Sequence, residues 1–115
     1  SPPVPGEVRA VEQPAGACFL MRSGLWREIG GFDEGFFLWY EDVDLCRRLV
    51  DAGYRNVVVG SAIAEHRGGV AFAGLSRRDQ QRIRLASLER YVGKHHARLV
   101  PLMRPTLRAA TWLRA

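Results

Sequence analysis

Apolar residues recur at helical spacing in three stretches of the chain. The first stretch covers about 41–52 and is followed by Gly53, a residue type that commonly ends helices. The second covers about 76–96, and the third is expected to begin after Pro101 and to end near Arg114. The residues predicted to face inward on the first two helices are Leu45, Cys46, Leu49, Ile83, Leu85, Leu88, Tyr91 and Val92.

Strand patterns and one short helix lie around these stretches. The apolar run GACFLMR, Gly16–Arg22, predicts a buried strand, and RNVVVG at 55–60 predicts a second one. Ser23 is expected to cap a short helix that stops at Gly30. The order of strands and helices indicates an α/β fold, with too few strands for a complete doubly wound sheet.

Glycine and proline residues mark the irregular parts of the chain. The segment GGFDEGFFLWY at 30–40 predicts a loop whose bulky side chains fold inward. A short extended piece at 61–66 leads into a glycine-rich loop at 67–74. The proline-rich start is expected to be extended and poorly ordered, and to be a truncation edge. The expected divisions are a lead-in at 1–15, a domain at 16–75 and a helical tail at 76–115.

Composition and charge narrow the function classes. The chain has 115 residues and a net charge of +5, which suits one small domain or a piece of a larger one. Residues 1–75 carry a net charge of −3, whereas residues 76–115 carry +8. An acidic domain with a basic tail argues against a nucleic-acid reader, and the tail favours an anionic surface such as phospholipid. The sequence contains no GxGxxG or GxxxxGK loop for nucleotide phosphates.

Features of the sequence that bear on location point to the cytoplasm. No run of about 18 apolar residues predicts a membrane span, and SPPVPGEVRAVEQ lacks the apolar core of a signal peptide. Cys18 and Cys46 lie far apart and outside any CxxC pattern, so reduced, buried thiols are expected, with a disulfide as the open alternative. We therefore expect a cytoplasmic protein, peripheral at the inner face of the plasma membrane where the basic tail meets lipid.

Three carboxylates, Glu41, Asp42 and Asp44, gather where the first long helix begins. The helix dipole stabilises a first-turn carboxylate by about 0.3–1 kcal/mol, and Arg47 and Arg48, three and four residues after Asp44, offer that residue local ion pairs. Asp42 instead shares its face with apolar residues such as Leu45. An inward carboxylate without a cation suits a general base that takes a proton from a hydroxyl group.

Two further residues are candidates for ligand contacts. Trp39 precedes the acidic cluster, and an aromatic face beside carboxylates commonly holds a sugar ring, although core filling is the alternative. His66 ends the extended piece beside the glycine-rich loop, where a neutral imidazole can bind a divalent cation.

In their order, these motifs resemble a known family. GACFLMR, then GGFDEGFFLWYEDVDLCRRLVDAGY, then a segment ending in His66 look like the C-terminal half of family 2 glycosyltransferases. These are inverting enzymes of the GT-A fold, and the nearest likeness is to the bacterial rhamnosyl- and galactofuranosyltransferases that build cell-surface polysaccharide. The resemblance covers about Gly16–Gly69. It implies a partial GT-A α/β unit of short strands and helices, followed by the basic helical tail.

The resemblance also implies roles for individual residues. Asp42 falls where the family has its catalytic base, and Glu41 beside it would help to hold the acceptor. Gly16 and Ala17 fall where the backbone approaches the donor sugar. His66, twenty-four residues after Asp42, falls on the metal ligand of metal-dependent relatives, which implies Mg²⁺ or Mn²⁺ in the intact enzyme.

The resemblance leaves out the donor half of such an enzyme. No Asp-x-Asp motif in the context that holds a metal against a diphosphate is present, so the fragment is expected to be inactive by itself. The implied partners are a nucleotide-sugar donor and a glycan or lipid-linked acceptor. The alternative function is a non-catalytic interaction or dimerisation module that uses the basic helices, with a homodimer as its product. A metal-binding domain built on Glu65 and His66 is a weaker alternative, because no ligand spacing supports it.

Overall fold

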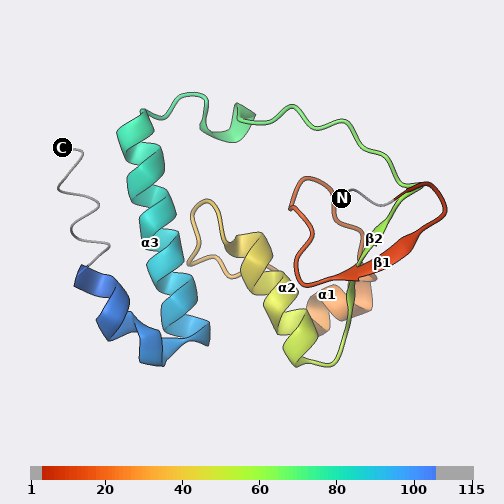
Figure 1. Ribbon diagram of the computed structural model, residues 1–115, viewed down its shortest axis with the longest axis horizontal. Helices are drawn as coiled ribbons and strands as arrows, with labels where there is room; N and C mark the ends of the chain where they lie inside the picture. Colours follow the sequence, from red (N-terminus) through yellow and green to blue (C-terminus); the bar gives the residue numbers. More distant parts are fainter. Residues whose placement is uncertain (1–3, 106–115) are drawn as a thin grey trace. The chain divides into compact units, whose positions relative to one another are not determined.

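The computed structural model describes residues 4–105, which group into two compact units (Figure 1). The first unit comprises the chain up to Asp33 together with Glu41–Gly68, and the second comprises Glu34–Tyr40 together with the chain from Gly69 onward. The boundaries expected at residues 15 and 75 stay predictions. Within the described residues, no helix has the length and apolar character needed to cross a membrane.

The sheet of the first unit has two antiparallel strands, β1 (Val8–Val11) and β2 (Asn56–Val59). Val8 lies opposite Val59, and Val11 lies opposite Asn56. The valine run predicted β2 correctly, whereas no strand was predicted at 8–11, within the lead-in at 1–15 that was expected to be extended. Strand pairing explains β1, because β2 offers it hydrogen bonds that an isolated extended segment lacks.

Two helices complete the first unit, and both end as the glycines predict. The short helix α1 (Ser23–Ile29) begins one residue earlier than expected, with Arg22 at the N-cap and no side-chain cap bond. It ends at Gly30, which has a left-handed φ of 79°. The helix α2 (Glu41–Asp51) ends in a Schellman motif, in which Gly53 at a φ of 85° allows the turn and the Tyr54 N–H donates to the Leu49 carbonyl at 2.9 Å.

The prediction of a buried strand at Gly16–Arg22 is wrong. This segment contains turns and irregular backbone, its Cys18 side chain is exposed, and Leu20 is fully exposed. The run has no partner strand among the described residues, and the N–H of Gly16 donates to the carboxylate of Asp42 instead. The structure likewise assigns no strand to the extended piece expected at 61–66.

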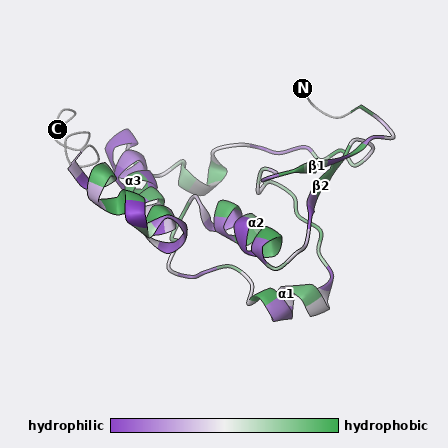
Figure 2. Ribbon diagram, turned by 60° about the horizontal axis from the view of Figure 1, so that its bottom comes forward, coloured by the Kyte–Doolittle hydropathy of each residue, from purple (hydrophilic) through white to green (hydrophobic). Residues whose placement is uncertain are grey.

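One face of α2 supplies most of the buried side chains of the first unit. Leu45, Cys46 and Leu49 are buried as the periodicity predicts, and Asp44 is buried among them. Figure 2 shows that α2 carries both hydrophobic and hydrophilic colour along its length. The small core therefore includes the charged carboxylate of Asp44, and a buried charge requires an oppositely charged or hydrogen-bonding partner.

The second unit is built on α3 (Arg77–His95), as the sequence predicts. Ser76 caps this helix, since its Oγ accepts a hydrogen bond from the Asp79 N–H at 3.1 Å. A 3₁₀ turn at Val70–Phe72 precedes the helix, where a glycine-rich loop was expected, and a second 3₁₀ turn at Ala97–Leu99 follows it.

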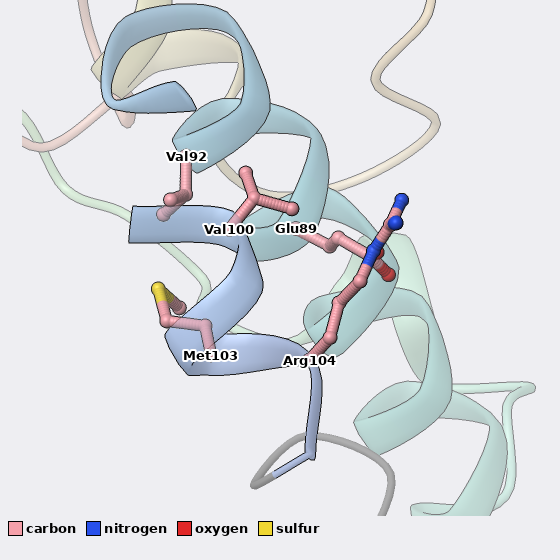
Figure 3. A pocket seen from close by; sticks show the side chains of 5 residues that line it. All are labelled: Glu89, Val92, Val100, Met103 and Arg104. Carbon is pink, nitrogen blue, oxygen red and sulfur yellow. The ribbon is translucent and has the colours of Figure 1, made fainter. Parts of the chain in front are cut away.

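Helical turns at 100–105 fold back against α3, and the predicted continuation of this helix toward Arg114 lies outside the described residues. Figure 3 shows Val100 and Met103 facing Val92 of α3, and Arg104 reaching Glu89. The Arg104 Nε lies 2.9 Å from the Glu89 Oε1, and the pair is exposed to solvent. The apolar contact among Val92, Val100 and Met103 and the surface ion pair therefore help to hold this return to α3.

The loop at 34–40 packs on α3 within the second unit. The Ser87 Oγ donates to the Leu38 carbonyl at 2.8 Å, and the guanidinium of Arg90 lies 5.3 Å from the ring centre of Phe36. Phe36 is buried, but Phe37 is 80% exposed. The expectation that the bulky side chains of this loop fold inward therefore holds for Phe36 and is wrong for Phe37.

Candidate functional site

Asp42 lies in the first turn of α2, where its half-buried carboxylate accepts hydrogen bonds from neutral donors. Oδ2 accepts from the Gly16 N–H at 3.0 Å and from the Gln13 side-chain amide at 3.2 Å, and Oδ1 accepts from the Val43 N–H at 2.8 Å. A carboxylate offers about four lone-pair positions, so these three donors leave capacity for one more hydrogen bond. The arrangement holds an ionised carboxylate in place without a cation from the described residues.

Gly16 allows the chain to approach the carboxylate this closely. A Cβ atom at this position would lie 2.8 Å from Oδ2 of Asp42 and 3.0 Å from its Cβ. Both distances are shorter than ordinary van der Waals contact, so a side chain here would displace the carboxylate. The structure thus brings together Gly16 and Asp42, two of the residues predicted to act at the site. Ala17, the residue after Gly16, is exposed.

The thiol of Cys46 lies one helical turn after Asp42 and stays protonated at neutral pH. Burial, and to a lesser extent the negative charge of Asp42, together raise the pKa of Cys46 from 9.0 to about 11. Both cysteines are free, and the prediction of a buried thiol is confirmed for Cys46 and wrong for Cys18, which is exposed. Asp42 therefore has a neutral neighbour on its own helix face.

Asp44 has the opposite surroundings. Its side chain is completely buried, and its Oδ2 lies 2.8 Å from the Nε of Arg48. Arg48 also donates to the carbonyls of Ile29 and Gly31, at 2.6 Å each, where α1 ends. The local ion pair that the sequence predicted is confirmed, and it additionally joins α2 to the end of α1.

Glu41 opens α2 and is half-buried. Its Oε2 is buried and has no hydrogen-bond partner among the described residues. Buried carboxylate oxygens are nearly always hydrogen-bonded, to protein groups, water or a ligand. An acceptor atom is therefore available directly beside Asp42 in the sequence.

Trp39 and Tyr40, the two residues before α2, share an uncommon backbone conformation. Their φ angles are 62° and 70°, in the left-handed region that non-glycine residues seldom adopt. Both belong to the second unit, where the ring of Trp39 lies 5.1 Å from that of Phe72 and the ring of Tyr40 lies 5.8 Å from that of Tyr91. Strain of this kind costs about 1–3 kcal/mol per residue and gathers at functional sites.

A family model described as glycosyltransferase like family 2 matches residues 6–86, which is more than half of the chain. The chain belongs to this glycosyltransferase family. The predicted family is thereby confirmed, and so is the prediction that the chain comes from an enzyme of the transferase class. The mixed helices and small antiparallel sheet agree with a partial nucleotide-sugar transferase-like domain.

Relatives of known name match part of the chain. The N-acetylglucosaminyl-diphospho-decaprenol L-rhamnosyltransferase of Mycobacterium tuberculosis is 45% identical over 58 residues, covering 50% of this chain and 19% of the relative. Rhamnosyltransferase WbbL of Escherichia coli is 44% identical over 56 residues, covering 49% and 21%. The low-salt glycan biosynthesis hexosyltransferase Agl10 of Haloferax volcanii is 29% identical over 62 residues, covering 51% and 19%. The matched part thus spans about a fifth of each relative's length, and no solved structure matches the chain.

The described residues do not by themselves fit a divalent metal. His66 is exposed, and its backbone carbonyl accepts a hydrogen bond from the Gly68 N–H at 3.1 Å. Within residues 4–105, no three His, Cys, Asp or Glu side chains gather around a common point. One imidazole is too few ligands for such an ion. The metal role of His66 therefore stays a prediction, and no chemical step is derived through a metal.

Two residues at the site escaped the sequence analysis. Gln13 contacts Asp42, and the side-chain amide of Asn56 donates to the carbonyls of Glu12 at 2.8 Å and Cys46 at 3.0 Å. Asn56 is buried and opens β2. A polar residue at the start of an apolar strand weakly indicates a buried side chain that hydrogen-bonds the backbone, as Asn56 does. No neighbouring residue indicates the contact between Gln13 and Asp42.

Proposed function

We propose that this chain is the acceptor-binding and catalytic-base part of an inverting glycosyltransferase with a GT-A fold, and that Asp42 is the general base. The observation that carries the proposal is the Asp42 carboxylate, which three neutral donors fix at the start of α2. Neutral donors orient the group, and a fourth lone-pair position remains for an acceptor hydroxyl. The share of each relative that is matched supports a longer enzyme whose donor half lies outside this chain.

The proposed reaction is a single displacement. The acceptor hydroxyl donates a hydrogen bond to Asp42, and its oxygen attacks the anomeric carbon of the nucleotide sugar. The bond between that carbon and the diphosphate breaks, its electron pair leaves with the diphosphate, and the hydroxyl proton passes to the carboxylate. Attack from the face opposite the leaving group inverts the configuration. A positioned base of this kind contributes about 10²- to 10⁴-fold to the rate.

Glu41 and Trp39 are proposed to bind substrate. The buried Oε2 of Glu41 lacks a donor among the described residues, so a second hydroxyl of the acceptor is the proposed partner. The strained backbone of Trp39 supports a role for this aromatic residue in sugar contact. Gly16 and Ala17 are proposed to lie near the donor sugar, and His66 is proposed to join a metal site that residues outside this chain complete.

The names of the relatives suggest which substrates to test first. Two of the relatives are named rhamnosyltransferases, and the name of one states a lipid-diphosphate-linked N-acetylglucosamine acceptor. We therefore propose a nucleotide-activated rhamnose as donor and a polyprenyl-diphosphate-linked sugar as acceptor. The enzyme is proposed to work in the cytoplasm, at the inner face of the plasma membrane, where such an acceptor is presented.

The test replaces Asp42 by Asn in the enzyme that carries this chain together with its donor half. We expect turnover to fall by about 10³-fold, because an amide cannot take the proton, while the affinity for the nucleotide sugar stays within about twofold. Asp51→Asn is the matched control, since Asp51 is an exposed carboxylate at the other end of α2 and should change turnover little. Retained turnover in Asp42→Asn, or loss of donor binding, would show that Asp42 is not the base.

A second candidate function is an interaction module formed by the basic tail. Arg77, Arg78, Arg82 and Arg84 are exposed on α3, in a region whose net charge is +8. Such a face suits an anionic partner, a phospholipid surface or a homodimer with an acidic region of a second copy. The two functions separate in the same assay, because neutralising these arginines should alter binding and leave the turnover of a soluble acceptor unchanged if the tail acts only in docking.

A further inference from the structure

Gln13 contacts the Asp42 carboxylate, although no role was predicted for it from the sequence. Its side-chain Nε2 donates to Oδ2 of Asp42 at 3.2 Å and to the carbonyl of Pro14 at 2.9 Å. Both partners are pure acceptors, so the amide nitrogen, and not the amide oxygen, must face them. The orientation of this amide is thereby fixed by its chemistry.

The segment that carries Gln13 is attached to α2 at two levels. The buried amide of Asn56 bonds the carbonyl of Glu12 and the carbonyl of Cys46, which lies one helical turn after Asp42. The N–H of Gly16 then bonds Asp42 itself. Gln13 therefore lies between two anchored points of the backbone, so the remaining conformational cost of its contact with the carboxylate is the ordering of its own side chain.

The two oxygens of Asp42 are consequently different. Oδ2 accepts from Gln13 and Gly16, which fill its two lone-pair positions, whereas Oδ1 accepts from Val43. A carboxylate turns about a broad, nearly two-fold torsion when nothing restrains it. Two donors on the same oxygen remove that freedom and direct the open lone pair of Oδ1 away from the segment at 12–16.

We infer that Gln13 is a positioning residue that fixes the plane of the Asp42 carboxylate, so that Oδ1 is the oxygen that receives the acceptor proton. This inference rests on the proposed function, because it assumes that Asp42 is the base. Gln13 acts through Asp42 and touches no reacting atom. Its expected contribution is to the rate of the chemical step and not to substrate binding, since a misplacement of about 1 Å can cost about 10²-fold in rate.

The kinetic test compares Gln13→Ala and Gln13→Glu in the full-length enzyme, with nucleotide-activated rhamnose as donor and a polyprenyl-diphosphate N-acetylglucosamine as acceptor. We expect kcat to fall by about 10- to 100-fold in Gln13→Ala while both KM values stay within about twofold. Gln13→Glu keeps the size of the side chain but cannot donate from its ionised form and places a like charge beside Asp42. We expect it to lose at least as much as Gln13→Ala, whereas a role in packing alone would leave it close to wild type.

The matched control is Gln80→Ala. The Gln80 amide also donates to a backbone carbonyl, that of Leu75 at 3.0 Å, but it belongs to the second unit and is placed in no part of the reaction. We expect its kcat to stay within about twofold of wild type. An equal loss in Gln80→Ala and Gln13→Ala would overturn the inference, because it would reveal a general effect of removing a glutamine.

A double variant separates failure of the inference from failure of the proposed function. In the Asp42→Asn background, measured with radiolabelled donor, we expect Gln13→Ala to cause no further loss, since its effect passes through the carboxylate. An additive loss, or a normal kcat in the single Gln13→Ala variant while Asp42→Asn is inactive, overturns only the inference. Full turnover in Asp42→Asn overturns the proposed function and the inference with it.

A measurement on the ¹⁵N-labelled chain tests the contact without any substrate. We expect the side-chain amide resonances of Gln13 to shift when Asp42 is replaced by Asn, and those of Gln80 to stay in place. Unchanged Gln13 resonances would overturn the inference directly, because they would show that the two side chains do not meet.

Discussion

Asp42 and Asp44 lie two residues apart at the start of α2, yet the structure treats them in opposite ways. Asp44 is fully buried, and its i+4 neighbour Arg48 pairs with it at 2.8 Å. Asp42 is half-buried, and its i+4 neighbour Cys46 carries a neutral thiol. The same helix turn thus holds one carboxylate beside a cation and one carboxylate among neutral donors.

The difference shows how to tell a structural carboxylate from a candidate base. Protonating a carboxylate that is paired with a guanidinium would abolish the attraction and leave the cation buried without its counter-ion. A carboxylate that neutral donors hold leaves no buried cation behind when it takes a proton. Asp42 therefore combines a fixed position with the absence of a paired cation among the described residues, whereas Asp44 connects α2 to the end of α1 through Arg48.

Replacing Asp44 by Asn should cause the largest loss of stability. Loss of the charge leaves Arg48, whose side chain is 19% exposed, without its counter-ion. We expect the free energy of unfolding to fall by about 3 kcal/mol. Urea denaturation of the chain measures this loss. Asp42→Asn is the counterpart, and we expect it to lose about 1 kcal/mol, as for a hydrogen bond with water nearby. Equal losses in the two variants would contradict the distinction between them.

The sequence predicted those parts of the fold that depend on neighbouring residues. The helix α2, its end at Gly53 and the helix α3 all follow from residues within a few positions of one another. Local sequence does not decide whether β1 or the run at 16–22 forms a strand. Both segments can extend, and only β1 finds β2 as a partner, a contact between distant parts of the chain that local pattern does not encode.

The residues of the candidate site likewise separate into those that local sequence predicts and those that it does not. Asp42 was distinguishable from Asp44 because the spacing to Arg48 is local and visible in the sequence. Gln13 and Asn56 were not found, since their bonds join residues 29 and 44 positions apart. The roles of Trp39, Glu41 and His66 stay predictions, because they concern a substrate and a metal ion, and the local pattern of residues does not specify how such ligands bind.

Titration of Cys46 should show the effect of the Asp42 charge on its surroundings, since this charge contributes to the raised pKa of the thiol. Its pKa is raised from 9.0 to about 11 in the folded chain, so the unfolded state loses its proton first as the pH rises. The stabilising contribution of the neutral thiol is therefore complete below about pH 9 and is lost as the pH approaches 11. Within that window we expect the free energy of unfolding to fall by about 1.4 kcal/mol per pH unit.

Urea denaturation across this pH range measures the effect, and Cys46→Ala should lack this part of the pH dependence. In Asp42→Asn the window should begin at the same pH and end lower, because burial still raises the pKa of Cys46 but the negative neighbour is gone. An unchanged window in Asp42→Asn would contradict the expectation that the Asp42 carboxylate is ionised beside the thiol.

Replacing Arg47 by Ala should have the smallest effect and gives the comparison its baseline. Arg47 and Asp51 form an ion pair on α2 with the same i,i+4 separation as Asp44 and Arg48 and nearly the same distance, 2.9 Å, but their side chains are 43% and 50% exposed. Water screens such a pair, so we expect a loss of no more than about 0.5 kcal/mol in urea denaturation. A loss as large as that of Asp44→Asn would mean that helix spacing alone sets the strength of these pairs. The expected gap between the two variants assigns it instead to the burial of Asp44 and to the carbonyls at the end of α1 that hold Arg48.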